Sequence, residues 1–335
     1  MKTSLLHAVT TMTPLRVSFL GGGTDFPTFH KTDEGLVISM AIQQFIYVTV
    51  KRHSPLFGER YRISYYETEH VNSVDEIKNE IVRACIELIG IQEPLFVGTA
   101  SDLPAMSGLG SSSSFAVGML NALHLLVGES VSAGQLAEEA CEVEITRLQK
   151  PIGKQDQYAA AFGGLNAFRF QTDGRVSVDA ITLDRDTSKL LNGLVMLWTG
   201  GPRTAESILY EQNKRTAQNQ DSLNTLVDLS KDFKAQLVCG DLTLQRFAEL
   251  LTQGWQIKRG LASTITSGPL DDAFKSCLKA GALGGKLLGA GGGGFLLMCV
   301  PPEEHDGFLK RVIPMVNVPV RLESQGSRVL SRVSL

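Results

Sequence analysis

The chain has 335 residues, which is enough for about two domains. Lysine and arginine total 32 against 35 aspartate and glutamate residues, and the net charge of −3 argues against a general nucleic-acid or membrane-surface binder. Five scattered cysteines and six dispersed histidines exclude a disulfide framework and a zinc cluster. No apolar run approaches the ~20 residues of a membrane span. We therefore expect a soluble, cytoplasmic protein without nucleic-acid or membrane partners.

The predicted elements mix strands and helices along the chain. Strand patterns cover residues 15–20, 37–50 and 95–99, and helix patterns cover 115–127 and 134–149. A new helix opens at 154–157, and residues 168–181 read as a hairpin that turns at Asp173-Gly174. After residue 200 the pattern is helical, until a strand at 295–300. The lack of strict βαβ alternation favours an α+β fold. We place a boundary near residue 190, giving domains 1–190 and 191–335.

Glycine is over-represented, and its placement is informative. Of 33 glycines, 13 fall in three clusters at 21–23, 108–110 and 281–294. The middle cluster, Pro104-Ala-Met-Ser-Gly-Leu-Gly-Ser-Ser, follows a strand and runs into an apolar helix. Unpaired N–H groups at a helix N-terminus form an anion site. A flexible Gly/Ser connector is the alternative, whereas the Walker A and dinucleotide patterns are incomplete here.

Two carboxylates are also informative. Glu144 shares one face of its predicted helix with Ala137, Cys141 and Leu148, and a carboxylate on an apolar face needs a metal ion or a cation as partner. A buried salt bridge would satisfy it equally well. Asp156 lies at the start of the next helix, where it could be an ionised base or only a helix cap.

Taken together, these residues resemble the GHMP kinases, a family of small-molecule kinases. Members carry, in this order, a Pro-x-Arg-Val strand with a glycine-rich turn, a Pro-x-x-Ser-Gly-Leu-Gly-Ser-Ser phosphate loop and a late glycine cluster. Here these are residues 14–25, 104–112 and 289–294. The resemblance implies a two-domain architecture with the nucleotide and sugar sites between the domains. It also implies ATP as phosphate donor and Mg²⁺ as cofactor.

The resemblance assigns roles to individual positions. It implies that Ser112 and Glu144 hold Mg²⁺ and that Asp156 acts on the acceptor hydroxyl, with Arg16 as its neighbouring cation. Lys154 is a second candidate for this cation because it is close to Asp156 in the sequence. Substrate contacts are expected from Gly23, Thr24, Asp25 and Gly292, and we assign an acceptor phosphate to Arg203. The expected nucleotide contacts are Pro104, Ser107, Gly108, Leu109, Gly110, Ser111, Ser112 and Ser113.

Among family members, the chain is most similar to those that phosphorylate heptose 7-phosphate on its anomeric hydroxyl, a step toward nucleotide-activated heptose for surface glycans. The similarity lies in Gly-Gly-Gly-Thr-Asp at 21–25, Gln-Asp-Gln-Tyr at 155–158 and Phe-Gly-Gly at 162–164. Galactokinases have Gly-Glu-His where this chain has three glycines. The expected partner is thus a small sugar phosphate. Fucose or a hexose as acceptor, a nicotinamide or flavin enzyme, and a regulatory protein without kinase activity are the alternatives. The oligomeric state stays open, a homodimer included.

Overall fold

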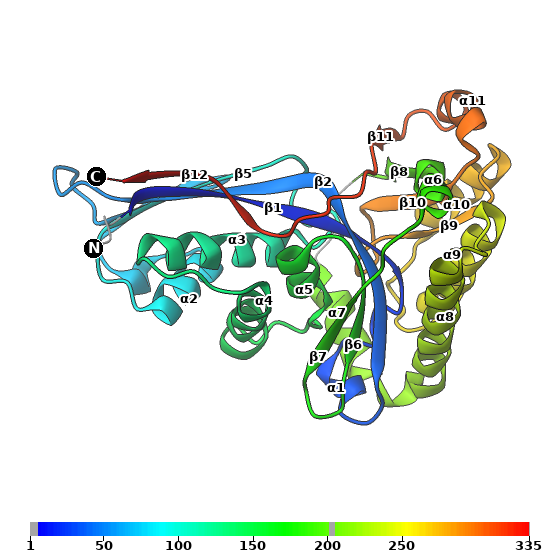
Figure 1. The fold of residues 1–335 in the computed structure, drawn as a ribbon, viewed down its shortest axis with the longest axis horizontal. Helices are drawn as coiled ribbons and strands as arrows, with labels where there is room; N and C mark the ends of the chain where they lie inside the picture. The colour runs from blue at the N-terminus through cyan, green and yellow to red at the C-terminus, as the bar shows by residue number, and fades with distance from the viewer. Residues whose placement is uncertain (1–5, 201–204, 335) are drawn as a thin grey trace.

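The computed structural model describes residues 6–200 and 205–334, which build two β-sheets (Figure 1). The order of the larger sheet is β12-β1-β2-β5-β3-β4, and the β6–β7 hairpin joins it through β2. All its strand pairs are antiparallel except β3 with β5. Its strands are β1 (Leu6–Leu20), β2 (Gly35–Arg52), β3 (Tyr61–Ser64), β4 (Thr68–Val71), β5 (Leu95–Ser101), β6 (Leu165–Phe170), β7 (Val176–Ala180) and β12 (Arg328–Ser334).

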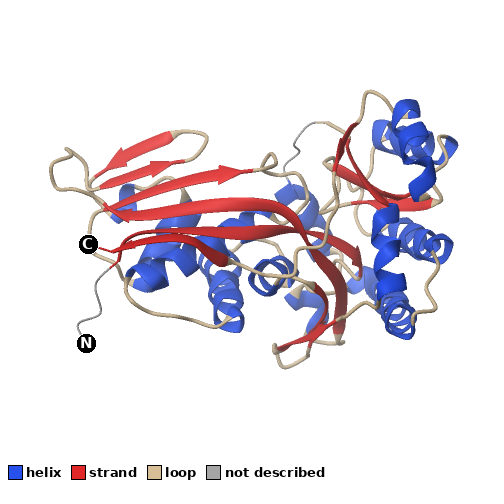
Figure 2. Ribbon diagram, turned by 45° about the horizontal axis from the view of Figure 1, so that its top comes forward, coloured by secondary structure: helices blue, strands red, loops and turns tan. Residues whose placement is uncertain are grey.

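Helices cover one face of the larger sheet (Figures 1 and 2). The predicted helix at 115–127 is confirmed as α3, although it begins four residues earlier. Its side chains are buried on nearly every side because it lies between the sheet and the neighbouring helices. These helices are α2 (Glu80–Ile89), α3 (Ser111–Leu126), α4 (Ala133–Cys141) and α5 (Gln155–Phe162).

A second sheet with its own helices forms the C-terminal half. Its strand order is β11-β8-β10-β9, with β8 (Leu194–Trp198), β9 (Gly284–Leu287), β10 (Phe295–Cys299) and β11 (Val316–Val318). The helices are α7 (Ala205–Lys214), α8 (Gln220–Cys239), α9 (Leu244–Arg259), α10 (Gly268–Lys279) and α11 (His305–Arg311), while the short α1 (Pro27–His30) and α6 (Arg185–Lys189) lie in connections. None of the described helices is long and apolar enough to cross a membrane.

Aromatic packing joins the two halves. Phe19 of β1 meets Phe233 of α8 and Phe247 of α9 edge to face, with ring centroids 5.8 and 5.2 Å apart. All three side chains are fully buried, and such edge-to-face pairs add stability beyond the burial of apolar area. The mixture of helices and sheets confirms the α+β prediction.

The C-terminal strand β12 belongs to the N-terminal sheet, which the predicted domain boundary did not take into account. Strand β12 pairs with β1 from Leu6 opposite Ser334 to Met12 opposite Arg328, so the last residues of the chain complete the N-terminal sheet. The prediction of residues 191–335 as one C-terminal unit did not include this return. The boundary near residue 190 stays a proposal, with β12 assigned to the first unit.

Candidate active site

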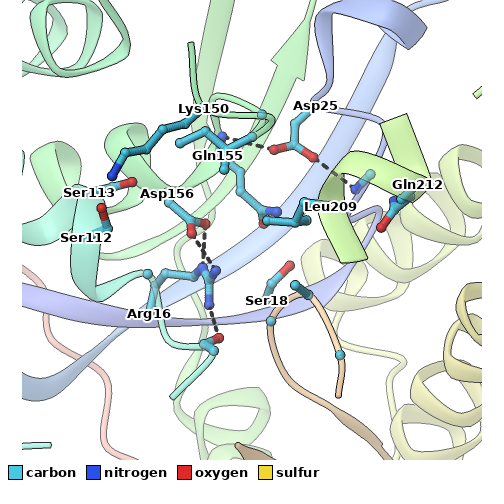
Figure 3. A pocket seen from close by; sticks show the side chains of 18 of the residues that line it. Arg16, Ser18, Asp25, Ser112, Ser113, Lys150, Gln155, Asp156, Leu209 and Gln212 are labelled. Carbon is cyan, nitrogen blue, oxygen red and sulfur yellow. Dashed lines mark hydrogen bonds and ion pairs between the residues drawn. The ribbon is translucent and has the colours of Figure 1, made fainter. Parts of the chain in front are cut away.

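A cavity of about 420 Å³ lies where the three glycine clusters meet (Figure 3). Its walls come from β1, the loop before α3, the start of α5, α7, α9 and the loop between β9 and β10. Arg16, Asp25, Ser112, Asp156 and Gln212 all line this one space. The tertiary structure therefore brings together residues that lie almost 200 positions apart in the sequence.

The phosphate loop is fixed against β1. Arg16 N–H donates to Leu109 O (3.0 Å), and Ser114 Oγ donates to Pro14 O (2.8 Å). Gly108 and Gly110 both have left-handed backbone torsions, with φ of +85° and +77°. Helix α3 then starts without a side-chain cap, so its first N–H groups remain available to an anion.

Five of the eight predicted nucleotide residues line the cavity: Gly108, Gly110, Ser111, Ser112 and Ser113. The other three do not. Pro104 is exposed away from the cavity, and Ser107 and Leu109 are fully buried, where they support the loop from beneath. The nucleotide contacts expected of these three residues stay predictions.

Glu144 lies in the cavity wall and faces the phosphate loop. The helix predicted at 134–149 is interrupted: α4 ends at Cys141, and residues Glu142–Arg147 form a π-helical turn, a feature that often marks functional sites. The predicted orientation holds, because Glu144 is 0% exposed.

The partners of Glu144 are hydroxyl and amide groups. Its carboxylate accepts from Ser112 Oγ (2.5 Å), Ser113 Oγ (2.6 Å) and Gln157 Nε2 (2.7 Å). No described cation lies within 4.0 Å, so the salt-bridge alternative is not what the structure has. Burial raises the pKa of the Glu144 carboxyl, and the serine hydrogen bonds oppose that shift.

These donors fit Mg²⁺. The pair of Ser112 and Glu144 offers only hard oxygen ligands beside an anion-binding helix start. The described residues contain no group of three or more acidic, histidine or cysteine side chains placed to hold a metal ion by themselves. Mg²⁺ commonly binds through one or two protein oxygens and keeps waters and substrate phosphates as its other ligands. The residues present therefore suit this ion.

Asp156 and Arg16 form the central ion pair. Arg16 Nε and Nη2 each donate to one carboxylate oxygen of Asp156 at 2.7 Å, and Nη1 donates to Gly108 O at 2.7 Å (Figure 3). Such two-point pairs fix the plane of the carboxylate. A β-carbon on Gly110 would lie 3.3 Å from Asp156 Oδ2, so the carboxylate touches the phosphate loop. Asp156 is thus paired with Arg16 across the cavity and does not cap its own helix.

Lys154 does not join this pair. Its Nζ donates to both carboxylate oxygens of Glu138 (3.2 Å) and to Gly174 O (3.3 Å), and the side chain does not line the cavity. The prediction of Lys154 as the neighbouring cation is wrong. Arg16, from a strand 140 residues away, supplies that charge.

In the first glycine cluster, Asp25 and Gly23 line the cavity as predicted, whereas Thr24 does not. Asp25 Oδ1 accepts from Gly23 N–H (2.9 Å) and Oδ2 from Gln155 N–H (3.3 Å), and burial raises the pKa of its carboxyl. Thr24 is fully buried and donates to Gly21 O (2.8 Å), so its role is to hold the turn.

Gly21 gives a stability prediction for this turn. Its φ is +86°, and a β-carbon there would lie 1.8 Å from Leu36 O, a severe overlap with backbone. We expect Gly21→Ala to lower the free energy of unfolding by ~2 kcal/mol or more. Urea denaturation measures this, and an unchanged unfolding midpoint would contradict the geometry.

The third glycine cluster packs against the phosphate loop. A β-carbon on Gly289 would lie 2.4 Å from Gly108 Cα, and one on Gly294 would lie 2.4 Å from Ser107 O. Gly292 donates to Ile265 O (2.9 Å) and is absent from the lining, although Gly291 and Gly293 are part of it. The predicted substrate contact of Gly292 is therefore not supported. Arg203 lies outside the described residues.

Two lysines of the cavity wall, the partly buried Lys258 and the buried Lys286, were missed from the sequence. Lys258 Nζ donates to Gly289 O (2.7 Å), and burial lowers the pKa of its ammonium to about 8 while the Asp25 carboxylate opposes the shift. Lys286 Nζ donates to Ser18 O and Phe19 O (2.8 Å each), which ties β9 to β1. Lys258 continues the apolar spacing of α9 three residues after Trp255. A lysine on the apolar face of a helix is the signal in the sequence from which Lys258 could have been predicted as a site residue.

Comparison with known proteins shows the family of the chain. Residues 77–164 match the GHMP kinase N-terminal domain, and residues 239–314 match the GHMP kinase C-terminal domain. The chain is 30% identical to D-glycero-alpha-D-manno-heptose 7-phosphate kinase of Campylobacter jejuni, covering 91% of this chain and 93% of that one. It is 25% identical to the galactokinase of Pyrococcus furiosus, over 89% and 91% of the two chains.

Solved structures share the fold. A D-glycero-D-manno-heptose 1-phosphate kinase from Bacteroides thetaiotaomicron superposes with a TM-score of 0.79 at 24% identity, covering 96% of this chain and 99% of that one. Lactococcus lactis galactokinase complexed with galactose gives a TM-score of 0.75 at 18% identity, over 96% and 95%. The chain belongs to the GHMP kinase family and is a small-molecule sugar kinase, a phosphotransferase with an alcohol group as acceptor.

Proposed function

We propose that the chain transfers the γ-phosphate of ATP to the anomeric hydroxyl of D-glycero-D-manno-heptose 7-phosphate, giving the 1,7-bisphosphate. The observation that best supports this kinase reaction is the contact of the Arg16–Asp156 pair with the phosphate loop. It puts a carboxylate beside the expected position of the transferred phosphoryl group. The choice of acceptor is supported by the similarity to the Campylobacter jejuni heptose 7-phosphate kinase.

The residues of the cavity can perform this reaction by positioning and charge stabilisation. Phosphoryl transfer passes through a loose transition state, so little covalent chemistry falls to the protein. Gly108, Gly110 and the N–H groups that open α3 would hold the ATP phosphates. Ser112 and Glu144 would hold Mg²⁺, which when bound supplies positive charge to the β- and γ-phosphates.

Asp156 would orient the acceptor hydroxyl and accept its proton as the oxygen attacks phosphorus. Arg16 fixes the plane of this carboxylate and also holds Gly108 of the phosphate loop. One guanidinium therefore sets the distance between the carboxylate of Asp156 and the loop that would hold ATP, the phosphate donor. Asp25, on the side of the cavity formed by the first glycine cluster, would accept hydrogen bonds from sugar hydroxyls.

An ADP-release assay over a panel of acceptors tests the proposal. The panel contains the heptose 7-phosphate, unphosphorylated heptose, mannose 6-phosphate, galactose and L-fucose. We expect the highest kcat/KM with the heptose 7-phosphate, and a new ³¹P NMR signal coupled to the anomeric proton. A preference of ~10-fold or more for galactose or fucose, or phosphorylation of another hydroxyl, would overturn the assignment.

A further inference from the structure

Three hydrogen-bond donors from separate elements converge beside Gly22. A β-carbon on Gly22 would lie 3.5 Å from Lys258 Nζ, 3.6 Å from Gln155 Nε2 and 3.8 Å from Ser18 Oγ. These are ordinary van der Waals distances, so such a carbon would touch all three groups without overlap. Ser18, Gln155 and Lys258 line the cavity. Ser18 comes from β1, Gln155 from α5 and Lys258 from α9 (Figure 3 labels the first two). We call this group the Gly22 cradle.

The cradle has unused hydrogen-bonding capacity. Lys258 Nζ has three protons and one described partner, Gly289 O, and no described carboxylate lies within 4.0 Å of it. Ser18 is 6% exposed, and its Oγ has no partner among the described residues. Buried polar groups are costly unless a partner completes them. The ammonium of Lys258, the amide N–H of Gln155 and the hydroxyl of Ser18 converge, and such a group of donors suits an anion.

The other cations of the cavity wall are already engaged. Arg16 is paired with Asp156, Lys150 Nζ lies 2.9 Å from Glu80, and Lys286 donates to two backbone carbonyls. Among the lining cations in the described part of the chain, Lys258 is the one that has a single hydrogen-bond acceptor and no carboxylate partner.

The cradle adjoins the first glycine cluster through Gly22, whereas the phosphates of ATP are expected at the start of α3, where Gly110 touches Asp156. Lys258 also holds Gly289 O, and Gly289 packs against Gly108, so the cradle borders the expected phosphate site. An acceptor with its reacting hydroxyl at Asp156 would extend toward Gly22. The neighbouring carboxylates are occupied, Asp156 by Arg16 and Asp25 by two backbone N–H groups.

We propose that Lys258, Gln155 and Ser18 around Gly22 bind the phosphate group that the acceptor already carries, and so select phosphorylated over unphosphorylated sugars. This inference rests on the proposed function, because only an acceptor that carries a phosphate needs such a site. An ammonium binds phosphate as a point charge, and the glycine at position 22 places no side chain between the three donors. The absence of a side chain at Gly22 is then a specificity determinant.

Two variants test the cradle by different means. Lys258→Met keeps the length of the side chain and removes its charge, and Gly22→Ala places a methyl group against the three donors without a backbone overlap. Each should lower the ratio of kcat/KM for phosphorylated over unphosphorylated heptose at least ~10-fold, the worth of one charged hydrogen bond. The KM for ATP should change little. Lys231→Met, on the exposed face of α8 beside Asp228, is the matched control.

The pH profile gives a readout that a purely structural role would not move. The charged groups that face Lys258 are Asp25, Arg16, Asp156 and Lys286, and burial sets its pKa at about 8 against an ordinary value of 10.5. Its charge is therefore lost as the pH rises through about 8. The KM for the sugar phosphate should rise above that pH in the wild type, but not in Lys258→Arg, which stays protonated.

Inorganic phosphate separates failure of this inference from failure of the proposed function. It should inhibit the wild type competitively against whichever acceptor the panel identifies, and Lys258→Met should relieve that inhibition. This result would support an anion site even if the acceptor is not the heptose. A preference for phosphorylated heptose that survives in both folded variants would overturn the cradle and leave the proposed function standing. Equal inhibition of wild type and Lys258→Met would also overturn it.

Discussion

Replacing Asp156 with asparagine is expected to lower kcat by ~10²-fold or more while the KM for ATP stays nearly unchanged. General base catalysis contributes about 10²–10⁴-fold, and an amide oxygen cannot take the proton of the acceptor hydroxyl. Asparagine keeps the size of the side chain and can accept one of the two hydrogen bonds from Arg16. Steady-state kinetics with saturating acceptor, and ATP binding measured by calorimetry, separate the chemical step from nucleotide affinity.

Asp173→Asn is the matched control for this substitution. Asp173 lies exposed at the turn of the β6–β7 hairpin, where it pairs with Arg175 (2.6 Å), far from the cavity lining. Its substitution should leave kcat within about twofold. Wild-type turnover in Asp156→Asn would show that the carboxylate neither accepts the proton nor orients the hydroxyl.

Replacing Glu144 with glutamine is expected to raise the Mg²⁺ concentration for half-maximal activity at least ~10-fold. Outer-shell partners of a metal already contribute 10–100-fold to affinity, and a direct carboxylate ligand contributes at least as much. The amide retains the shape of the side chain, but its nitrogen replaces one oxygen and cannot accept. Either the hydrogen bond from Ser112 or those from Ser113 and Gln157 are then lost, together with the negative charge. A Mg²⁺ titration at fixed ATP measures the shift.

Glu142→Gln controls for a change of charge in the same π-helical turn. Glu142 pairs with Arg147 at 3.3 Å and is partly exposed, so its metal titration should match the wild type. An unaltered titration in a folded Glu144→Gln variant would limit Glu144 to a structural role, holding Ser112 and Ser113 in place. Thermal melting of both variants shows whether either substitution acts through stability instead.

Local features of the site could be read from the sequence because short-range geometry decides them. The positive φ values of Gly108 and Gly110 and the free helix start after them depend on a few adjacent residues. The burial of Glu144 followed from helical spacing, which survived the change to a π-helical turn because the residue still falls on the inward face.

The failures have a common physical cause, which is that closeness along the chain is not closeness in space. Lys154 precedes Asp156 by two residues, about 200° around a helix, so its ammonium points to Glu138 and away from the cavity. Thr24 and Leu109 stand inside correct motifs, yet the turns direct them into the core.

Composition and motifs thus determined the fold class, the phosphate loop and the two carboxylates of this sugar kinase. Only the tertiary structure decided which cation holds Asp156, that β12 returns to the first sheet, and that Lys258 of α9 meets Gln155 and Ser18 beside Gly22. Backbone preference and helical period act over a few residues, and the sequence displays them directly. The pairing of charges across the cavity depends on how distant parts of the chain pack together, which no local pattern encodes.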